Sequence, residues 1–297
     1  MIEVKGLVKS FDGFEALSSA TLTVPTGSVY GLVGPNGAGK TTLIKHLTGV
    51  YRQDKGIVSY DGDLIWENAA LKDRVIYIPD SLYFPLGTIS DMRVFYKNTY
   101  SSFSDERFEK LKDLFGFDLK KPLRTFSKGQ TRQIAFWLAL SCMPEYLILD
   151  EPMDGLDPVM RHQVWSLLMS EVEKRNLTIL VSSHNLRELE DVCDMVAIMN
   201  KGSVLIERSL EELQDNMTKM QVVFREDAEE ALKEIPAVHV SNIGRVYTII
   251  LRMPPKEARA VLGKYNPVIA DALPLTLEEI FIYELGGAYD GIDEILE

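Results

Sequence analysis

The chain has 297 residues, of which 32 are basic and 44 acidic, and its formal net charge is −12. Hydrophobic residues make up 46% of it, which is enough for an ordinary core in one large domain or two modest ones. The negative charge repels a phosphate backbone, and no basic stripe along the sequence offsets it. Nucleic acid is therefore not an expected partner.

Membrane insertion and secretion are not expected either. No run of about eighteen mostly apolar residues occurs, and the first residues, MIEVKGLVKS, lack the apolar core of a signal peptide. The two cysteines, Cys142 and Cys193, lie among apolar residues, which predicts buried reduced thiols rather than a disulfide framework. These features together predict a cytosolic protein.

The first part of the sequence predicts antiparallel strands followed by a strand, loop and helix unit. Residues 1 to about 25 alternate in strand fashion around an Asp-Gly turn signal. The run SVYGLVG at 28–34 is a short buried strand that enters a glycine-rich loop, and TTLIKHLTG at 41–49 has the apolar spacing of a helix. From about 85 to 123 the sequence is charged and helix-periodic, which predicts a helical insert.

The rest of the sequence predicts a parallel sheet and then a second domain. Apolar runs at 146–150, 178–182 and 195–199 alternate with helical segments, which is typical of a mostly parallel sheet with helical crossovers. Near residue 217 the composition changes, and the segments then read strand, helix, strand, strand, helix, strand. This order predicts a small α+β domain of the ferredoxin-like type over 217–297.

The segment GPNGAGKT at 34–41 satisfies the pattern G-x-x-x-x-G-K-[ST] after a strand and before a helix. Backbone N–H groups at its glycines can wrap phosphates, Lys40 supplies positive charge to the β and γ groups, and the Thr41 hydroxyl can ligate Mg²⁺. The sequence therefore predicts a nucleoside triphosphate site.

Two carboxylates stand side by side where the buried strand YLILD ends. Because neighbouring residues on a strand point opposite ways, Asp150 and Glu151 are expected to have different roles, Asp150 holding Mg²⁺ and Glu151 polarising a water. His184 closes another strand, TILVSSH, beside the phosphate loop, where it could contact a γ-phosphate. A purely structural histidine is the alternative.

A second helix start of the kind that binds anions occurs about ninety residues after the phosphate loop, in FSKGQ at 126–130. Ser127 can cap this helix and Gly129 leaves its backbone bare. No phosphate loop lies near it in the sequence.

Taken in order, GPNGAGKTT, FSKGQ, LILDEP, GLDP and SSH resemble the ATP-binding subunit of an ABC transporter, over residues 1 to about 215. The resemblance implies Mg²⁺-dependent ATP hydrolysis in an α/β P-loop NTPase fold of the ABC type. We expect an ATPase domain over 1–216, with a helical subdomain at about 85–143, before the C-terminal accessory domain.

The resemblance also implies roles for individual residues. Asp150 matches the Walker B aspartate, Glu151 the general base, His184 the switch histidine and Asp157 the D-loop aspartate. Phe11 matches the aromatic that stacks on adenine, although it could instead pack in the first hairpin, close to a second phenylalanine. The residues implied to bind ATP are Phe11, Gly34, Asn36, Gly37, Gly39, Lys40, Thr41 and Thr42.

Two departures from the family pattern matter. In the signature segment, Ser127, Gly129 and Gln130 match the usual LSGGQ, whereas a phenylalanine and a lysine replace the leucine and the first glycine. At the Q-loop position the usual glutamine is matched by Asp80, which can reach Mg²⁺ but cannot donate as an amide can. The implied Mg²⁺ ligands are therefore Thr41, Asp80 and Asp150.

The resemblance implies two protein partners. The signature helix would complete the nucleotide site of a second ABC ATPase subunit, either identical or paralogous, and a separate transmembrane permease subunit would form the pore. The predicted C-terminal domain and the ending LTLEEIFIYELGG resemble the drug, antibiotic-peptide and lipid exporters of the ABC-2 type. The expected location is cytoplasmic, peripheral on the inner face of the cell membrane.

The main alternative is a soluble ABC ATPase that is not tied to transport. Translation-associated members carry two cassettes in one chain, and chromosome-maintenance members insert a long coiled coil before the signature; this sequence shows neither feature. A nucleotide-gated module without hydrolysis is disfavoured by Glu151 and His184. The identity of the transported substrate does not follow from the sequence.

Overall fold

A computed structural model describes residues 1–85, 87–184, 186–225 and 228–285. The described chain divides into two compact units, the first formed by Met1–His184 and Val192–Glu207 and the second by the other described residues. Residues 286–297, which include the end of the predicted C-terminal domain and the glycines of LTLEEIFIYELGG, lie outside the described residues.

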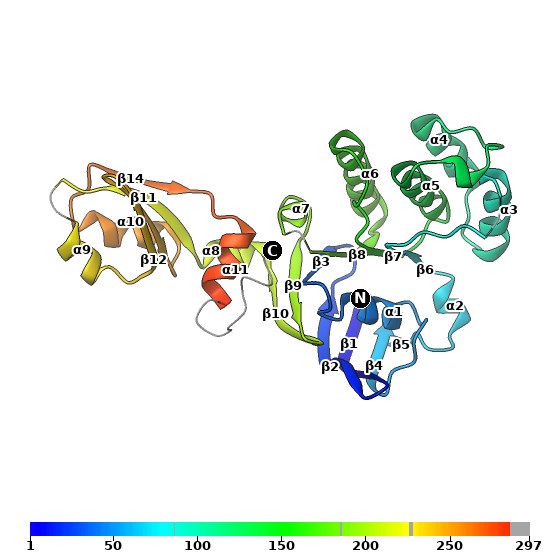
Figure 1. Cartoon of the computed structure of the whole chain (residues 1–297), viewed down its shortest axis with the longest axis horizontal. Coiled ribbons are helices and arrows are strands. Elements are labelled where there is room, and N and C mark those ends of the chain that lie inside the picture. Colours follow the sequence, from blue (N-terminus) through cyan, green and yellow to red (C-terminus); the bar gives the residue numbers. More distant parts are fainter. Residues whose placement is uncertain (86, 185, 226–227, 286–297) are drawn as a thin grey trace. The chain divides into compact units, whose positions relative to one another are not determined.

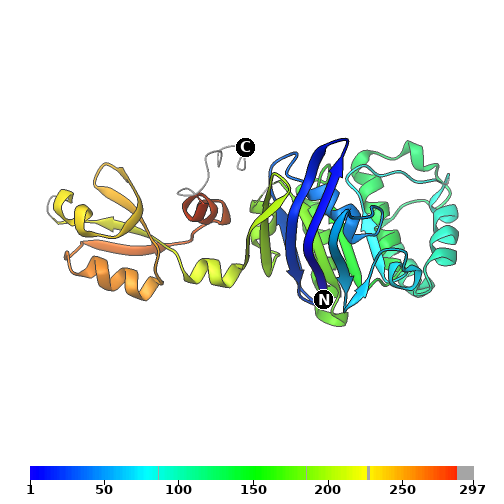
Figure 2. The ribbon, with the colours of Figure 1, turned by 90° about the horizontal axis from the view of Figure 1, so that it is seen from below.

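The first unit begins with an antiparallel sheet, as predicted. It is formed by β1 (Ile2–Phe11), β2 (Phe14–Val24), β4 (Lys55–Tyr60) and β5 (Asp63–Leu64), in the order β2-β1-β4-β5 (Figure 2). The turn between β1 and β2 is Asp12-Gly13, and both residues have left-handed backbones, with φ of 48° and 86°. Such a pair matches the twist of a two-residue hairpin, which explains why this dipeptide was a reliable signal.

The second sheet of this unit contains the predicted parallel strands. It consists of β3 (Val29–Val33), β6 (Val75–Ile78), β7 (Tyr146–Asp150), β8 (Thr178–Ser183), β9 (Met195–Asn200) and β10 (Ser203–Ser209), in the order β10-β9-β3-β8-β7-β6 (Figure 1). β3 pairs in parallel with β8 and β9, and β7 pairs in parallel with β6 and β8. Every residue of β3, β7 and β8 is buried, which accounts for their continuous apolar runs.

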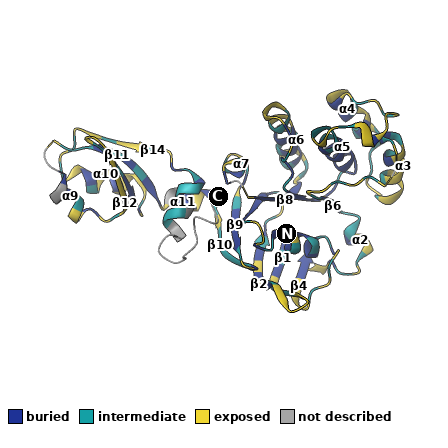
Figure 3. Ribbon diagram, in the orientation of Figure 1, coloured by how far each residue is buried: buried dark blue, intermediate teal, exposed yellow. Residues whose placement is uncertain are grey.

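Helices cover this sheet. α1 (Lys40–Leu47) contacts β7 as well as β2 and β4, so it lies between the two sheets, and α2 (Ala69–Lys72) contacts β6. The helix α6 (Pro158–Arg175) connects β7 to β8. The buried strands and the half-exposed helices are visible in Figure 3.

The predicted helical insert is confirmed. It contains α3 (Ile89–Thr99), α4 (Asp105–Phe115), the 3₁₀ turn η1 (Leu123–Thr125) and α5 (Lys128–Ser141), which lie together in Figure 1. The rings of Phe108 on α4 and Trp137 on α5 are stacked with their centroids 4.5 Å apart, and the Trp137 indole N–H donates to the carbonyl of Phe108 at 2.9 Å. Both side chains are fully buried, so they anchor α4 to α5.

The second unit has its own antiparallel sheet and its own core. After α7 (Arg187–Glu190) and α8 (Leu210–Asp215), the elements are β11 (Thr218–Val223), α9 (Glu229–Glu234), β12 (Ala237–Ile243), β13 (Val246–Leu251), α10 (Pro255–Gly263), β14 (Ile269–Leu273) and α11 (Leu277–Leu285). The sheet order is β12-β13-β11-β14. The predicted sequence of strands and helices is therefore confirmed, and its apolar core includes Met220, Ile249 and Leu262.

Both cysteines are buried free thiols, as predicted, and burial raises the pKa of each. Among the helices within the described ranges, none combines the length and the apolar character required to cross a bilayer.

Candidate active site

The parallel sheet brings three chain segments to one edge. Because β8 lies between β3 and β7, the carboxyl ends of these strands are neighbours. β3 leads into the glycine-rich loop, β7 leads into Glu151, and β8 leads into His184. Ligands of open α/β sheets bind at this edge.

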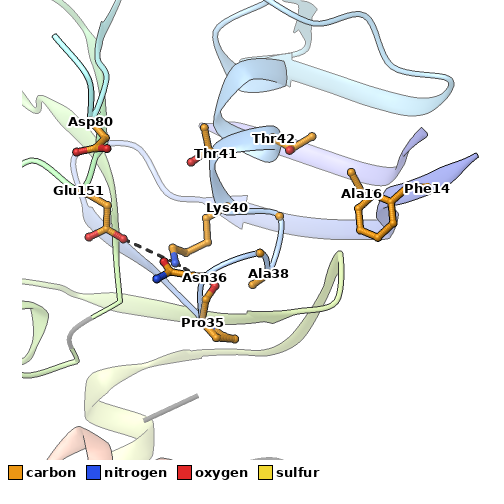
Figure 4. Close-up of a pocket in the computed structure, with 12 residues that line it drawn as sticks. Phe14, Ala16, Pro35, Asn36, Ala38, Lys40, Thr41, Thr42, Asp80 and Glu151 are labelled. Carbon is orange, nitrogen blue, oxygen red and sulfur yellow. Dashed lines mark hydrogen bonds and ion pairs between the residues drawn. The ribbon is translucent and has the colours of Figure 1, made fainter. Parts of the chain in front are cut away.

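A cavity of about 340 Å³ lies over the glycine-rich loop (Figure 4). Most residues of the predicted phosphate loop line it, and Figure 4 shows Asp80 and Glu151 on one side of the loop and Phe14 and Ala16 on the other. The lining residues are Phe14, Ala16, Pro35, Asn36, Gly37, Ala38, Gly39, Lys40, Thr41, Thr42, Asp80 and Glu151.

The start of α1 is built to face an anion. Its N-cap, Gly39, has a left-handed backbone with φ of 103° and no side chain that could occupy the first N–H groups of the helix. A Cβ atom at this position would lie 2.8 Å from the carbonyl oxygen of Ala16, so only glycine fits without rearrangement. The free N–H groups and the positive end of the helix dipole both favour a phosphate here.

Lys40 is buried beside this loop, with 7% of its surface exposed. Its ammonium group donates to the carbonyl oxygen of Gly34 at 2.5 Å and lies 3.7 Å from Oε1 of Glu151. Burial lowers the pKa of Lys40, although the charges of Glu151 and Asp150 oppose that shift. Phosphate oxygens could take the place of the Gly34 carbonyl and the Glu151 carboxylate as partners of the ammonium group.

Glu151 lies just beyond β7 and joins two other predicted site residues. One carboxylate oxygen approaches Lys40, and the other lies 2.9 Å from Nδ1 of His184. Its backbone N–H donates to the carbonyl oxygen and to the hydroxyl of Ser182, both at 3.2 Å. Burial raises the pKa of Glu151, while Lys40 and His184 lower it, and the net direction is upward. A raised pKa suits a carboxylate that accepts a proton near neutral pH.

The geometric reason that we gave for the different roles of the two carboxylates was wrong. Glu151 is not an alternating strand residue, because its φ of 45° places it in the left-handed region after the strand has ended. This turn of the backbone directs its side chain to the cavity, whereas Asp150 stays in the strand.

Asp150 is buried and does not line the cavity. It is only 1% exposed, and its carboxylate accepts hydrogen bonds from the hydroxyls of Ser182 at 2.6 Å and Tyr77 at 3.5 Å. Burial and the charge of Asp150 raise the pKa of Tyr77, which keeps that hydroxyl protonated as a donor. Tyr77 and Ser182 therefore fix the orientation of the buried carboxylate.

The donors at this edge fit Mg²⁺ bound together with a nucleotide. The Thr41 hydroxyl and the Asp80 carboxylate line the cavity and supply the hard oxygen atoms that Mg²⁺ prefers. Within the described residues, no group of three or more histidine, cysteine, aspartate or glutamate side chains could hold a metal by itself. Phosphate oxygens would have to complete the coordination, as is usual for Mg²⁺ sites of this kind.

The structure places Phe14, rather than Phe11, in the lining of the cavity. The Phe11 ring packs edge-on against Tyr51 with their centroids 5.4 Å apart, and the Lys9 ammonium lies 5.4 Å from the Phe11 centroid. Phe14 faces Phe11 across the hairpin and is 68% exposed. Phe14 is therefore the phenylalanine of this hairpin that lines the cavity.

The signature residues Ser127, Gly129 and Gln130 do not line this cavity. Ser127 caps α5, as predicted: its hydroxyl accepts from the N–H of Gln130 at 3.2 Å, and the Gln130 side chain accepts from the N–H of Ser127 at 3.0 Å. A Cβ atom at Gly129 would lie 2.5 Å from the carbonyl oxygen of Gly155, so this glycine also permits close packing against the loop after β7.

Asp157 caps the next helix. Its carboxylate accepts from the N–H groups of Val159 and Met160, both at 3.0 Å, at the start of α6. Like the signature residues, it does not line the cavity.

Our reading of the sequence missed several residues of this region. Ser182 and Tyr77 hold Asp150, and Phe14 lines the cavity. The signal for Ser182 was present, because two serines end the otherwise apolar strand TILVSS. No comparable signal distinguishes Tyr77 from an ordinary core residue.

A phosphate loop at the start of α1, with carboxylates at the ends of neighbouring strands, defines a P-loop nucleoside triphosphatase. The sequence profile of the family described as "ABC transporter" matches residues 17–154. YtrB, an ABC transporter ATP-binding protein of Bacillus subtilis (strain 168), is 30% identical over 97% of this chain and 99% of its own length. The chain belongs to the ABC transporter family, as an ATP-binding subunit.

Other similarities agree with this assignment. The lantibiotic transport ATP-binding protein SrtF of Streptococcus pyogenes is 31% identical over 75% of this chain and 98% of its own. A solved ATP-binding subunit of an ABC transporter has a TM-score of 0.66 at 29% identity, over 72% of this chain and 92% of that one. A bacterial ABC transporter cassette solved as a dimer has a TM-score of 0.64 over 71% and 99% of the two chains, and its 20% identity shows likeness of fold alone. The protein binds ATP and hydrolyses it to energise transport.

Proposed function

We propose that this chain drives export, with Glu151 as the general base of ATP hydrolysis at the cavity over the phosphate loop. The observation that carries this proposal is the contact of Glu151 with both Lys40 and His184 at the cavity edge. Lys40 would hold the β- and γ-phosphates, and His184 would keep the carboxylate of Glu151 directed at the attacking water. The implied nucleotide contacts are those of Gly34, Asn36, Gly37, Gly39, Thr41 and Thr42.

Mg²⁺ is the proposed cofactor, and when bound it would offset the charge of the phosphates. Thr41 and Asp80, which line the cavity, would hold it together with the buried Asp150. The bonds from Ser182 and Tyr77 leave Asp150 in one orientation, so little reordering is needed when a metal and nucleotide enter.

The active unit is proposed to be a dimer in which Ser127, Gly129 and Gln130 of one chain contact the nucleotide of the other. Two observations support it. The start of α5 is an N-terminal helix end of the kind that binds phosphate, and its residues do not line the cavity of their own chain. Asp157, at the start of α6, would lie in the same interface as the D-loop residue.

The dimer is proposed to bind a transmembrane permease subunit at the inner face of the membrane, which gives the chain a cytoplasmic, peripheral location. The likeness to a lantibiotic transport protein favours an exporter. We also propose that the ATPase domain covers 1–216 and that 217–297 form a ferredoxin-like accessory domain. The order of the strands in the sheet supports the ferredoxin-like domain. If the four strands are numbered 1 to 4 along the chain, β12-β13-β11-β14 is the order 2-3-1-4.

The experiment is the Glu151→Gln variant assayed in the full-length protein for ATP binding and for turnover. The amide keeps the size of the side chain but cannot take a proton, and a general base typically contributes about 10² to 10⁴ in rate. We expect ATP binding to persist and turnover to fall by at least about 10². The matched control is Glu173→Gln, an exposed glutamate on α6, which should keep the parent rate. Turnover of Glu151→Gln within about threefold of the parent would reject the assigned base.

A further inference from the structure

Arg132 is a buried guanidinium group that the nucleotide site described above does not include. It lies on α5 and is 0% exposed. Its two terminal nitrogens donate to the backbone carbonyls of Pro79, at 2.7 Å, and Asp80, at 2.8 Å. The guanidinium group thus hydrogen-bonds to two successive peptide carbonyls of the loop after β6.

The same loop presents a carboxylate to the nucleotide cavity. The Asp80 side chain is 49% exposed and lines the cavity with Thr41 and Glu151. Its Oδ1 atom lies 3.5 Å from the nearest nitrogen of Arg132, which is much longer than the bonds to the two carbonyls. Arg132 therefore bonds chiefly to the backbone of Asp80, while the Asp80 carboxylate makes only this longer ion pair with Arg132 and lines the cavity.

Burial makes this arrangement costly to disturb. Burial lowers the pKa of Arg132, and the carboxylates of Asp80, Asp154 and Asp150 oppose that shift. A buried cation that loses its partners is strongly destabilising. The loop and α5 are therefore held to each other at this point rather than packed loosely.

We propose that Arg132 is a positioning residue for Asp80, holding the loop so that this carboxylate points at the Mg²⁺-nucleotide in the cavity. The inference rests on the proposed Mg²⁺ site. It also explains how an aspartate works where the family has a longer glutamine: the shorter side chain reaches the cavity only if its backbone is held in place. Because Arg132 lies on α5 and Ser127 caps the start of that helix, the position of Asp80 is tied to the signature segment.

Equilibrium binding of a fluorescent, non-hydrolysable ATP analogue to the full-length chain, with Mg²⁺ titrated, tests the inference. Arg132→Lys keeps the charge but cannot bond both carbonyls in the planar fork geometry, and Arg132→Gln removes the charge. If position matters, both variants raise the Mg²⁺ concentration for half-maximal binding about tenfold, the usual effect of losing a residue that orients a metal ligand. Both variants should bind the analogue in EDTA as the parent does. The control Arg124→Gln, at an exposed arginine, should match the parent in both the Mg²⁺ titration and the EDTA measurement.

The Asp80→Asn variant completes the design, because this exposed side chain can change without opening the core. Asp80→Asn should raise the Mg²⁺ midpoint by a similar factor. The double variant Asp80→Asn with Arg132→Gln should have a midpoint no higher than that of the more affected single variant, because both changes act through one carboxylate. An unchanged midpoint in Asp80→Asn, an Arg132→Lys variant that behaves like the parent, or factors that multiply in the double variant would each overturn the inference. Asp150→Asn separates the two proposals: if it too leaves the midpoint unchanged, the proposed Mg²⁺ site itself is wrong.

Discussion

Nδ1 of His184 lies 2.9 Å from Oε2 of Glu151, while the other carboxylate oxygen of Glu151 lies 3.7 Å from the Lys40 ammonium. The carboxylate thus lies between the ammonium group of Lys40 and the imidazole of His184 at the end of the adjacent strand. Burial nevertheless outweighs both partners and raises its pKa. The ionised form of Glu151 is therefore destabilising to the fold, a cost that is common at catalytic carboxylates.

This cost predicts a pH-dependent gain in stability for Glu151→Gln. A carboxylate whose pKa rises on folding is penalised above that raised pKa, and the penalty fades as the pH falls toward the ordinary glutamate value of about 4.3. At pH 7 the variant should be more stable by roughly 1 kcal/mol, a rise of about 2 to 4 °C in melting temperature. Melting curves recorded in steps down to about pH 5 should show the gain shrinking. A gain of the same size at every pH would mean that ionisation is not its source.

The two phenylalanines of the first hairpin should differ in their effect on nucleotide affinity. Phe14 lines the cavity, whereas the Phe11 ring packs on Tyr51. A base stacked on an aromatic ring typically gains about 1 to 3 kcal/mol, so Phe14→Ala should weaken ATP binding by about fivefold to 150-fold. Phe11→Ala should have a smaller effect on affinity. Titration of each variant with ATP and, in parallel, with inorganic triphosphate checks the base contact, because triphosphate binding should not change. The reverse ranking would return the adenine contact to Phe11.

Much of the site could be predicted because its signals are local. The phosphate loop, the cap at Ser127 and the two carboxylates at the end of β7 each depend on a few consecutive residues and on the element that precedes them. The contact of Arg132 with Asp80 could not be predicted, because 52 residues separate the two positions and only the packing of α5 against the loop after β6 brings them together. The left-handed backbone of Glu151 was also hidden, since a non-glycine residue gives no sign that it will adopt one.

The choice between the phenylalanines shows a further limit. Both residues flank the Asp-Gly turn and face each other across the hairpin, so the turn predicts the hairpin but not which ring meets the cavity. That depends on how the hairpin lies over the phosphate loop, where Ala16 contributes a carbonyl close to Gly39. The resemblance implies an adenine contact for Phe11, which stays a prediction, whereas the packing of the hairpin places Phe14 in the lining of the cavity.

Asp157 should have separable roles in folding and in turnover. As the N-cap of α6, Asp157 accepts hydrogen bonds from two backbone N–H groups. Asp157→Ala should therefore lower the free energy of unfolding by about 1 kcal/mol. Asp157→Asn keeps a good capping side chain and should unfold at nearly the parent denaturant concentration. If Asp157 also acts across the proposed dimer interface, Asp157→Asn will lose ATPase activity while keeping its stability. Parent-like turnover in a stable Asp157→Asn variant would limit this residue to capping.

The proposed dimer makes its sharpest prediction for chains that are defective at different halves of the site. Lys40→Ala removes the cation that is proposed to bind phosphate in its own cavity. Ser127→Asp keeps a strong cap for α5 but places a negative charge where a partner's γ-phosphate would bind. Each variant alone should lose at least about 10² in ATPase rate, as the loss of a single stabilising donor can cause.

In a mixed dimer the two defects should complement each other at one site. The intact Lys40 belongs to the Ser127→Asp chain and the intact signature belongs to the Lys40→Ala chain, so together they form one complete cavity. ATPase activity should return in dimers carrying one differently tagged copy of each variant and purified through both tags. A signature that served its own chain would give no rescue, because the Ser127→Asp chain would then spoil the only cavity with an intact Lys40. The shared site would be refuted if activity is not rescued and Ser127 makes no contact with the partner's nucleotide in an ATP-bound dimer. If Ser127 makes that contact but activity is not rescued, both sites must be intact for turnover.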